Sequence, residues 1–322
     1  MVGNYDRFKC CLIFLFVSMH YADDLDVRII REMGNADSLQ WNVRETYSSI
    51  AGRLGVDEET VRRRLKRAER LGSLPNWKMM VNPRLIGCGA ANIQLEVRDE
   101  KRKSEIISEL RKIDGIVKIL DFRGWKLLLT LYFQDDDLLK TKKDKIGSIS
   151  GCTEPIAWEL GFPEPRIHMK TTDWKIISSM LDDARRSLKD VSESIGVSVR
   201  TVERKLNEMS ERRAVYLQGT PNFSKFAGLS CVFIVFCPDK MKKLAVDRAI
   251  LSKVKRIELA NTSSKQYSTF VTLFDNLAES DDFIDWISGL DGVNSVSMGI
   301  MRELLVVQKW LREEVTKRQL KR

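Results

Sequence analysis

The chain carries the same pattern twice, and this internal repeat constrains its fold more than any other feature of its 322 residues. The segment IAGRLGVDEETVRRRLKRAE, which begins at Ile50, returns as VSESIGVSVRTVERKLNEMS, which begins at Val191. Upstream, LDVRIIREM resembles TDWKIISSM at an offset of 147. A β-rich apolar stretch follows each copy, so the sequence predicts four alternating units, A-B-A′-B′. At a constant offset of 141, Gly55, Val56, Thr60, Val61 and Leu65 recur unchanged in the second segment.

The first A unit has the pattern of three helices. Apolar residues at helical spacing predict a lead helix over 27–33, a second helix over 46–54 and a third after Asp57. Gly55 is the expected end of the second helix, because glycine adopts the left-handed conformation that closes helices. The Asp57 carboxylate is the expected cap of the third helix. Two helices joined by a tight glycine turn predict a helix-turn-helix, and residues 74–81 are expected to form an extended pair, the wing.

The second A unit repeats these signals. Gly196 is its turn glycine, Ser198 is its helix cap, and residues 216–220 are its expected wing. Beyond the helices, Val81-Asn82-Pro83 is aligned with Thr220-Pro221-Asn222. The chain is therefore expected to contain two winged helix-turn-helix domains.

The third helix of each A unit carries basic residues on its outer face. At about 100° per residue, Val61, Leu65 and Ala68 fall together toward the core, and the corresponding residues of the second copy do the same. Arginine and lysine on the outer side can neutralise phosphates or reach guanine edges, and threonine can contact either. A basic helix face is common in itself, but its occurrence twice after a glycine turn favours DNA contact. The predicted DNA-contacting residues are Thr60, Arg62, Arg63, Arg64, Lys66, Arg67, Arg200, Thr201, Arg204, Lys205 and Asn207.

The B units alternate apolar runs with polar helices in the order βαββαβ, the ferredoxin-like arrangement. The expected strands of the first unit are 90–97, 116–122, 125–133 and 155–160, and those of the second are 229–236, 254–260, 267–274 and 293–301. A charged helix over 303–317 is expected to close the chain.

These units predict an α+β fold in which two winged helix-turn-helix domains alternate with two ferredoxin-like domains. The two ferredoxin-like domains are expected to pack sheet against sheet within the chain. The junction over 161–170 is short and holds two prolines, so it should be stiff. The predicted boundaries are an N-terminal extension over 1–22, domains over 23–84, 85–165, 166–223 and 224–302, and a C-terminal charged helix over 303–322.

Charge and composition narrow the function classes. The chain has 54 Lys and Arg against 45 Asp and Glu, a net charge of +9, which favours an anionic partner such as nucleic acid. It has no apolar stretch of about 18 residues, which a spanning helix would need. With two histidines it cannot build a three-histidine metal site, and a Ser-His-Asp triad is a poor fit. Its six cysteines form no C-x-x-C motif and are expected to be reduced in a cytoplasmic protein. No metal and no cofactor is expected.

The N-terminus carries an apolar run, CCLIFLFVSM, behind Arg7 and Lys9. This is the shape of a signal peptide, but no small-x-small cleavage site follows it. Met19 is the preferred start, with residues 1–18 as an untranslated extension. An ordered or membrane-touching segment and a cleaved signal are the alternatives.

The stretch IAGRLGVDEETVRRRLKRAERLGSL, followed by VNPRLIG, resembles the Lrp/AsnC, or feast/famine, transcription regulators. The resemblance covers about residues 24–165 well and 172–301 loosely. It implies a winged helix-turn-helix followed by a ferredoxin-like effector and oligomerisation domain. The family pattern has one such pair per chain and this chain has two, so the resemblance implies a tandem-duplicated form. The family's usual Gly-Asp hairpin is replaced by Arg123-Gly124-Trp125 and by Ser263-Ser264-Lys265.

The function expected from this resemblance is that of a sequence-specific DNA-binding regulator, not an enzyme, built as an internal pseudo-dimer with double-stranded DNA as its partner. A small-molecule effector and a higher homo-oligomer are left open. One alternative is a sirohaem decarboxylase-like enzyme of the same fold pairing, whose tetrapyrrole pocket the resemblance ties to histidine and arginine. In this chain the B units hold no histidine, and His168 lies at the junction after the first. The other alternative is a ligand-sensing adaptor that does not bind DNA.

Overall fold

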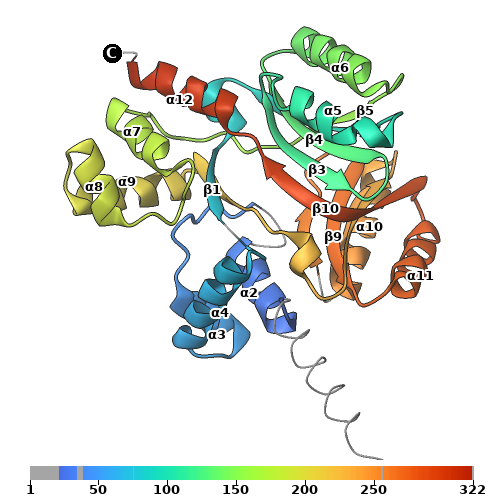
Figure 1. The fold of residues 1–322 in the computed structure, drawn as a ribbon, viewed down its shortest axis with the longest axis horizontal. Helices are drawn as coiled ribbons and strands as arrows, with labels where there is room; N and C mark the ends of the chain where they lie inside the picture. Colours follow the sequence, from blue (N-terminus) through green and yellow to red (C-terminus); the bar gives the residue numbers. More distant parts are fainter. Residues whose placement is uncertain (1–21, 35–38, 75, 255–256, 321–322) are drawn as a thin grey trace, which may run out of the picture.

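The computed structural model describes residues 22–34, 39–74, 76–254 and 257–320. Figure 1 shows two groups of helices on one side of the molecule and the helix-covered sheets on the other. The expected extension over 1–18, with its start at Met19, lies outside the described residues. Among the described helices, none is long and apolar enough to span a membrane.

The first helix-turn-helix has the local structure that its sequence predicts. It consists of α2 (Asp24–Gly34), α3 (Tyr47–Leu54) and α4 (Glu58–Leu71). Gly55 closes α3 in the left-handed conformation, with a φ of 68°. The Asp57 side chain accepts a hydrogen bond from the Thr60 backbone N–H and caps α4. Both expected end signals are therefore confirmed.

The second helix-turn-helix repeats this construction with α7 (Thr171–Met180), α8 (Leu188–Ile195) and α9 (Val199–Glu211). Gly196 ends α8 and the Ser198 side chain caps α9, as expected. The inward-facing residues are buried in both copies, which confirms the helical-wheel assignment. They are Val61, Leu65 and Ala68 on α4 and Val202, Leu206 and Met209 on α9.

Each ferredoxin-like domain contributes four strands and two main helices in the predicted order. The strand orders are β5-β2-β4-β3 and β10-β7-β9-β8. The first domain comprises β2 (Gly89–Glu96), α5 (Lys103–Leu110), β3 (Ile116–Phe122), β4 (Lys126–Phe133), α6 (Asp136–Ser150) and β5 (Ile156–Leu160). The second comprises β7 (Leu229–Phe236), α10 (Lys240–Lys253), β8 (Ile257–Asn261), β9 (Tyr267–Phe274), α11 (Leu277–Ser288) and β10 (Ser295–Val306).

Strand β10 is longer than expected and belongs to both domains. Its first half pairs with β7, and its second half crosses over to pair with β3. The expected end of this strand near residue 301 and the expected helix start at Glu303 are therefore wrong. The apolar run Leu304-Leu305-Val306 continues the strand because β3 offers it a free edge for hydrogen bonding. The closing helix, α12, spans Lys309–Leu320.

The two sheets pack face to face, as the duplication predicts. Leu128 and Trp158 of the first sheet share a buried cluster with Val232 and Val271 of the second. The Trp158 ring stacks on Tyr267 with 4.7 Å between ring centroids. Helices α5 and α6 cover the outer face of the first sheet and α10 and α11 that of the second, as Figure 1 shows.

The two wings differ from the expectation. Residues 74–81 do not fold into an extended pair. They contribute one strand, β1 (Trp77–Val81), which pairs antiparallel with β6 (Val215–Gly219) from the other copy. A segment this short cannot supply two strands and a turn, so each copy finds its partner in the other.

The structure also shifts the alignment of the two copies by one residue beyond the wings. Asn82 and Asn222 each cap a short 3-10 helix, η1 (Pro83–Ile86) and η3 (Phe223–Lys225). These two asparagines are therefore the equivalent residues, whereas the sequence alignment set Asn82 opposite Pro221.

A buried tyrosine pair joins this two-stranded ribbon to the first sheet. The Tyr132 hydroxyl on β4 donates to the Val81 carbonyl at 3.1 Å and lies 2.8 Å from the Tyr216 hydroxyl on β6. Burial raises the pKa of both phenols, so both remain neutral and can donate.

Replacing Tyr216 with phenylalanine should destabilise this junction. The variant loses one buried hydrogen bond while keeping the ring, so we expect a cost of about 1–2 kcal/mol, seen as a lower melting temperature. Tyr267→Phe is the matched control, because that ring is only half-buried and should melt close to the parent. Equal melting temperatures for the Tyr216 variant and the parent would contradict the assignment.

Candidate nucleic-acid interface

The outer face of α4 presents four exposed basic side chains: Arg62, Arg63, Lys66 and Arg70. The last three recur at intervals of three or four residues, which places them on one side of a helix. Together with neighbouring residues of α4 they line a shallow hollow on the surface. A concave basic strip on this third helix of the domain suits a phosphate backbone.

Arg64 and Arg67, which were predicted to contact DNA, form ion pairs within the domain. Arg67 Nη1 lies 2.6 Å from Asp26 Oδ2 on α2, and Arg64 pairs with both Asp23 and Asp26. Asp26 is almost fully buried, with 2% of its side chain exposed. These two arginines therefore hold α4 against α2, and their contact with DNA stays a prediction.

The second copy contains the same internal pair. Lys205 Nζ on α9 lies 2.5 Å from Asp173 Oδ1 on α7, and both side chains are largely buried. Asp173 also accepts a hydrogen bond from the Lys170 backbone N–H at 2.7 Å, as Asp26 does from that of Asp23 at 3.1 Å. Lys205 therefore holds α9 against α7, and its contact with DNA stays a prediction.

The two carboxyls of the first cluster respond differently to their surroundings. Burial raises the pKa of Asp23 but hydrogen bonds from Arg64 and from the Asp26 backbone N–H lower it more, so the net direction is down. Burial is the main cause that raises the pKa of Asp26. Paired with two arginines, these carboxyls leave little net charge at the base of the hollow.

The outer face of α9 has a mixed charge. Arg200, Arg204 and Asn207 are exposed there, but Glu203 and Glu208 are exposed beside them. Arg204 Nη1 lies 3.7 Å from Glu208 Oε2, an exposed pair one helical turn apart. The attraction for phosphates is therefore weaker at α9 than at α4.

The remaining predicted residues lie at the helix starts. Thr60 Oγ1 donates to Asp57 Oδ2 at 2.8 Å, and the Thr201 and Ser198 hydroxyls are 2.9 Å apart. Arg62 pairs with Glu58 at 2.5 Å in an exposed contact that a phosphate could replace. The two threonines thus support the caps at the points where α4 and α9 begin.

The sequence-based set missed Arg70 and the residues that join the two helix-turn-helix domains. The sequence could have indicated Arg70, because it lies seven residues after Arg63, about two helical turns further along the same face. Arg44 Nη2 donates to the Arg186 carbonyl at 2.7 Å, and Arg185 Nη1 donates to the Glu45 carbonyl at 2.9 Å. Burial, followed by repulsion from Arg185, lowers the pKa of Arg44 to about 10.

These contacts fix the spacing of the two third helices. The junction over 161–170 adds to them, because the Asn82 side chain donates to the Pro163 carbonyl at 2.9 Å and to the Arg213 carbonyl at 2.8 Å. The two helix-turn-helix domains therefore form one unit, in which the positions of α4 and α9 relative to each other are fixed.

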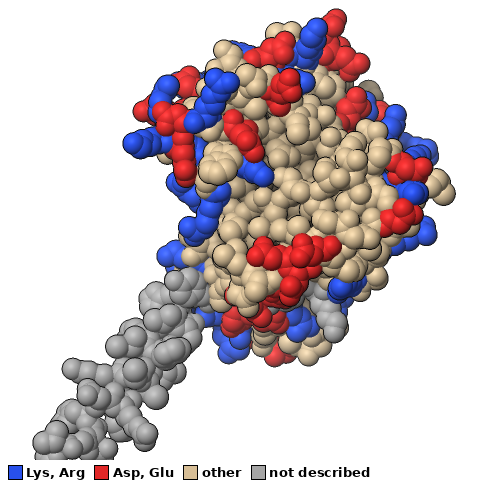
Figure 2. All heavy atoms as spheres, turned by 90° about the vertical axis from the view of Figure 1, so that its right-hand side faces the viewer, with Lys and Arg blue, Asp and Glu red and all other residues tan. Residues whose placement is uncertain are grey.

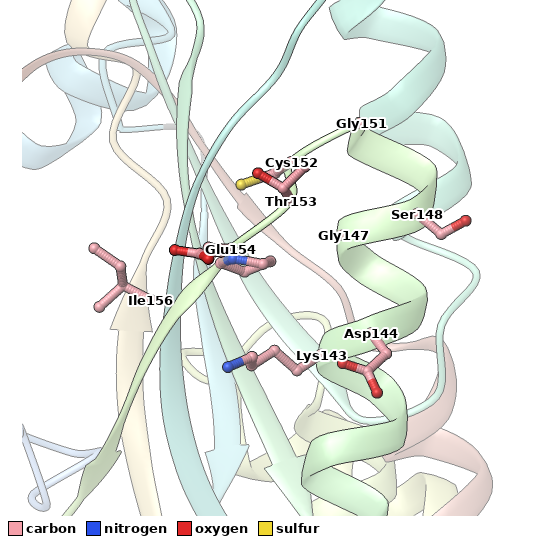
Figure 3. Close-up of a pocket in the computed structure, with 10 residues that line it drawn as sticks. Lys143, Asp144, Gly147, Ser148, Gly151, Cys152, Thr153, Glu154 and Ile156 are labelled. Atoms are coloured by element: carbon pink, nitrogen blue, oxygen red, sulfur yellow. The ribbon is translucent and has the colours of Figure 1, made fainter.

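The opposite side of the molecule has a different character. Figure 2 shows a broad uncharged centre with lysine, arginine and acidic side chains interspersed around it. A separate hollow lies between α6 and the loop before β5, where the loop crosses close to the helix at Gly147. In Figure 3, Asp144 and Ser148 point away from this hollow, whereas Lys143 extends from α6 toward the loop before β5. Within the described ranges, no group of three or more His, Cys, Asp or Glu side chains could hold a metal ion.

Comparison with known proteins agrees with this geometry. Residues 23–69 match the AsnC-type helix-turn-helix domain, and residues 169–213 match a winged helix-turn-helix DNA-binding domain. The chain is related to the Lrp/AsnC transcription regulators. It is 27% identical over 119 residues to the HTH-type transcriptional regulator LrpA of Pyrococcus horikoshii, which spans 36% of this chain and 84% of LrpA. It is 28% identical over 131 residues to the regulator FL11 of Pyrococcus furiosus, which spans 40% of this chain and 82% of FL11.

Among solved structures, the sirohaem decarboxylase NirDL has a similar fold over most of the chain. Its TM-score is 0.54 at 12% identity, and the match covers 90% of this chain and 98% of NirDL. This likeness supports the tandem fold. The structure of E. coli AsnC covers 46% of this chain and 96% of its own, at 18% identity and a TM-score of 0.31.

Breaking the internal acid–base pair should destabilise each helix-turn-helix. Asp26→Asn removes the buried carboxylate that Arg64 and Arg67 share and leaves them only the more exposed Asp23, and Asp173→Asn removes the carboxylate that pairs with Lys205. We expect each to cost about 1–3 kcal/mol, less than a fully buried pair because the bases keep some solvent contact. Thermal melting checks this, with Glu58→Gln as the control in an exposed pair that should change stability by less than about 0.5 kcal/mol. Parent-like melting of both aspartate variants would refute the structural role.

Proposed function

We propose that this protein is a DNA-binding transcriptional regulator of the Lrp/AsnC type, and not an enzyme, whose two helix-turn-helix domains form a fixed internal pair. The observation that carries the proposal is the exposed basic strip of Arg62, Arg63, Lys66 and Arg70 on α4. Asp23 and Asp26 pair with Arg64 and Arg67 and not with these four side chains, which lie exposed toward a DNA phosphate. The names of the related regulators support the same function.

The internal pair takes the place of a two-fold dimer. One helix-turn-helix reaches few bases, so such proteins gain specificity by binding two half-sites. Here the second helix-turn-helix belongs to the same chain. The β1–β6 ribbon and the contact between Arg44 and the Arg186 carbonyl hold it beside the first. The described cysteines Cys88, Cys152 and Cys237 are free thiols, which suits the reducing cytoplasm in which we place this regulator.

Removing Arg63 should weaken DNA binding more than removing Arg204. Arg63 lies in the strip of like charge, whereas Arg204 is partly neutralised by Glu208. Each phosphate that the variant no longer neutralises should reduce the slope of log K against log salt by about 1. Fluorescence anisotropy on DNA fragments selected from genomic DNA, at several salt concentrations, measures both quantities.

The control for this experiment is Arg111→Ala, which removes an exposed positive charge from the first ferredoxin-like domain. It should leave the affinity and the slope near those of the parent. An Arg63→Ala variant with parent affinity and parent slope would contradict the role of α4, and a parent that binds no selected fragment would favour the adaptor alternative.

The preferred operator should have two unlike half-sites. The outer faces of α4 and α9 carry different residues, and the spacing between the two helices is fixed. Their half-sites should therefore lie about one helical turn, 10–10.5 base pairs, apart or a multiple of that. Footprinting of the parent and of Arg63→Ala would test this, since the variant should lose protection over one half-site. A perfectly palindromic site bound by two chains would refute it.

A second candidate function, tetrapyrrole decarboxylation, is favoured by the fold likeness to NirDL over 90% of this chain. This enzymatic function requires the protein to bind an iron tetrapyrrole. Titration with an iron porphyrin carboxylate, followed by visible absorption, decides between the two: a saturable shift of the Soret band that His168→Ala abolishes would support the enzyme. No saturable shift is expected for a regulator.

A further inference from the structure

An apolar pocket lies where the first helix-turn-helix meets the sheets. Its walls come from α2, the β1–β6 ribbon, strands β3, β9 and β10, and the turn around η3. Its volume is about 110 Å³. For comparison, an engineered apolar cavity of about 150 Å³ holds benzene. The pocket is therefore of a size to enclose a small organic molecule.

The lining is mostly hydrocarbon. Leu120, Leu217, Phe226, Met301 and Leu304 contribute apolar surface from four different elements. The polar side chains are two glutamines and one lysine. Gln40 is already used, since its Nε2 donates to the Met33 carbonyl and its Oε1 accepts from the Asn42 backbone N–H.

Among the described residues of this lining, Lys118 on β3 is the one that carries a charge. Its Nζ donates to Gln218 Oε1 at a long 3.4 Å. No aspartate or glutamate is among the described residues that line the pocket. Burial lowers the pKa of Lys118 to about 8, which records how poorly this ammonium is compensated. An anion placed beside Nζ would stabilise the charged form of Lys118 and raise its pKa again.

We propose that this pocket binds a small monocarboxylate with a branched or aromatic apolar body. The carboxylate would pair with Lys118, and the apolar body would fill the space between Leu217 and Leu304. A free amino acid fits less well, because its ammonium group would enter a space in which no described lining residue carries a carboxylate to receive it. The charge and the apolar surface therefore select for an acid without an amino group.

Occupancy of this pocket would act on the first helix-turn-helix. Ile30 and Gly34 of α2 form one wall, while Leu120 and Leu304 of the joined sheets form another. A bound molecule would bridge the two and strengthen the placement of α2, and with it that of α4 through Arg64 and Asp26. This consequence rests on the proposed function, whereas the binding itself does not.

Isothermal titration of the full chain with 3-methylbutanoate and phenylacetate tests the site. Leucine, phenylalanine and 3-methylbutanamide are the matched comparison ligands, which add an ammonium or remove the charge. We expect saturable 1:1 binding of the acids, at least about tenfold weaker binding of the others, and at least about tenfold loss with Lys118→Gln. Lys112→Gln, which removes an exposed lysine paired with Glu109, should bind like the parent.

A second variant tests whether binding needs the volume of the pocket as well as the charge of Lys118. Leu304→Phe should fill the pocket and abolish acid binding while Lys118 is retained, with its melting curve showing that it folds. Equal affinity for acids, amino acids and the amide, or full binding by Lys118→Gln, would overturn the proposal. Arg63→Ala should keep acid binding, so a failure of DNA binding and a failure of this site give different results.

Discussion

The antiparallel pairing of β1 with β6 is the interaction on which the rest of the arrangement depends. Each strand follows the third helix of one helix-turn-helix and leads, through a capped 3-10 turn, into the first strand of one ferredoxin-like domain. Pairing at this point places the two halves as a two-fold dimer would place two chains. The Tyr132–Tyr216 hydrogen bond then fastens the ribbon to the sheet, so the spacing of α4 and α9 follows from buried contacts.

Much of this fold could be predicted from the sequence because many of its signals are local. The caps at Asp57 and Ser198 act within one helical turn, and the core stripe of α4 depends only on helical period. The long strand β10 and the shared ribbon could not be predicted this way, since their partners lie far along the chain. Val306, for example, pairs with Lys118. The apolar run before Val307 was a signal for strand, but the charged residues beyond it favoured an earlier helix.

The site shows the same division. A helical wheel separates inward from outward positions, but it does not reveal which outward base meets an acid from another helix. Arg64 and Arg67 pair with Asp26, which lies 38 and 41 residues away. One signal was available: Asp26 and Asp173 recur in the lead helices, and Arg64 and Lys205 recur in the third helices. An acid and a base that return together in both copies point to a contact that each copy needs for folding.

The two copies share this internal pair and differ in what surrounds it. The second helix-turn-helix is braced by α12, whose Gln319 donates to the Trp174 carbonyl on α7 and whose flanking Gln308 donates to the Leu181 carbonyl at the end of α7. The first has no such helix among the described residues and rests on the ribbon, the Ala22–Phe226 bridge and the walls of the apolar pocket. The more basic of the two outer faces, that of α4, thus belongs to the first helix-turn-helix, which has fewer supporting contacts. A change in the packing around Lys118 would therefore reach α4 before it reached α9, because α9 is anchored from a second side.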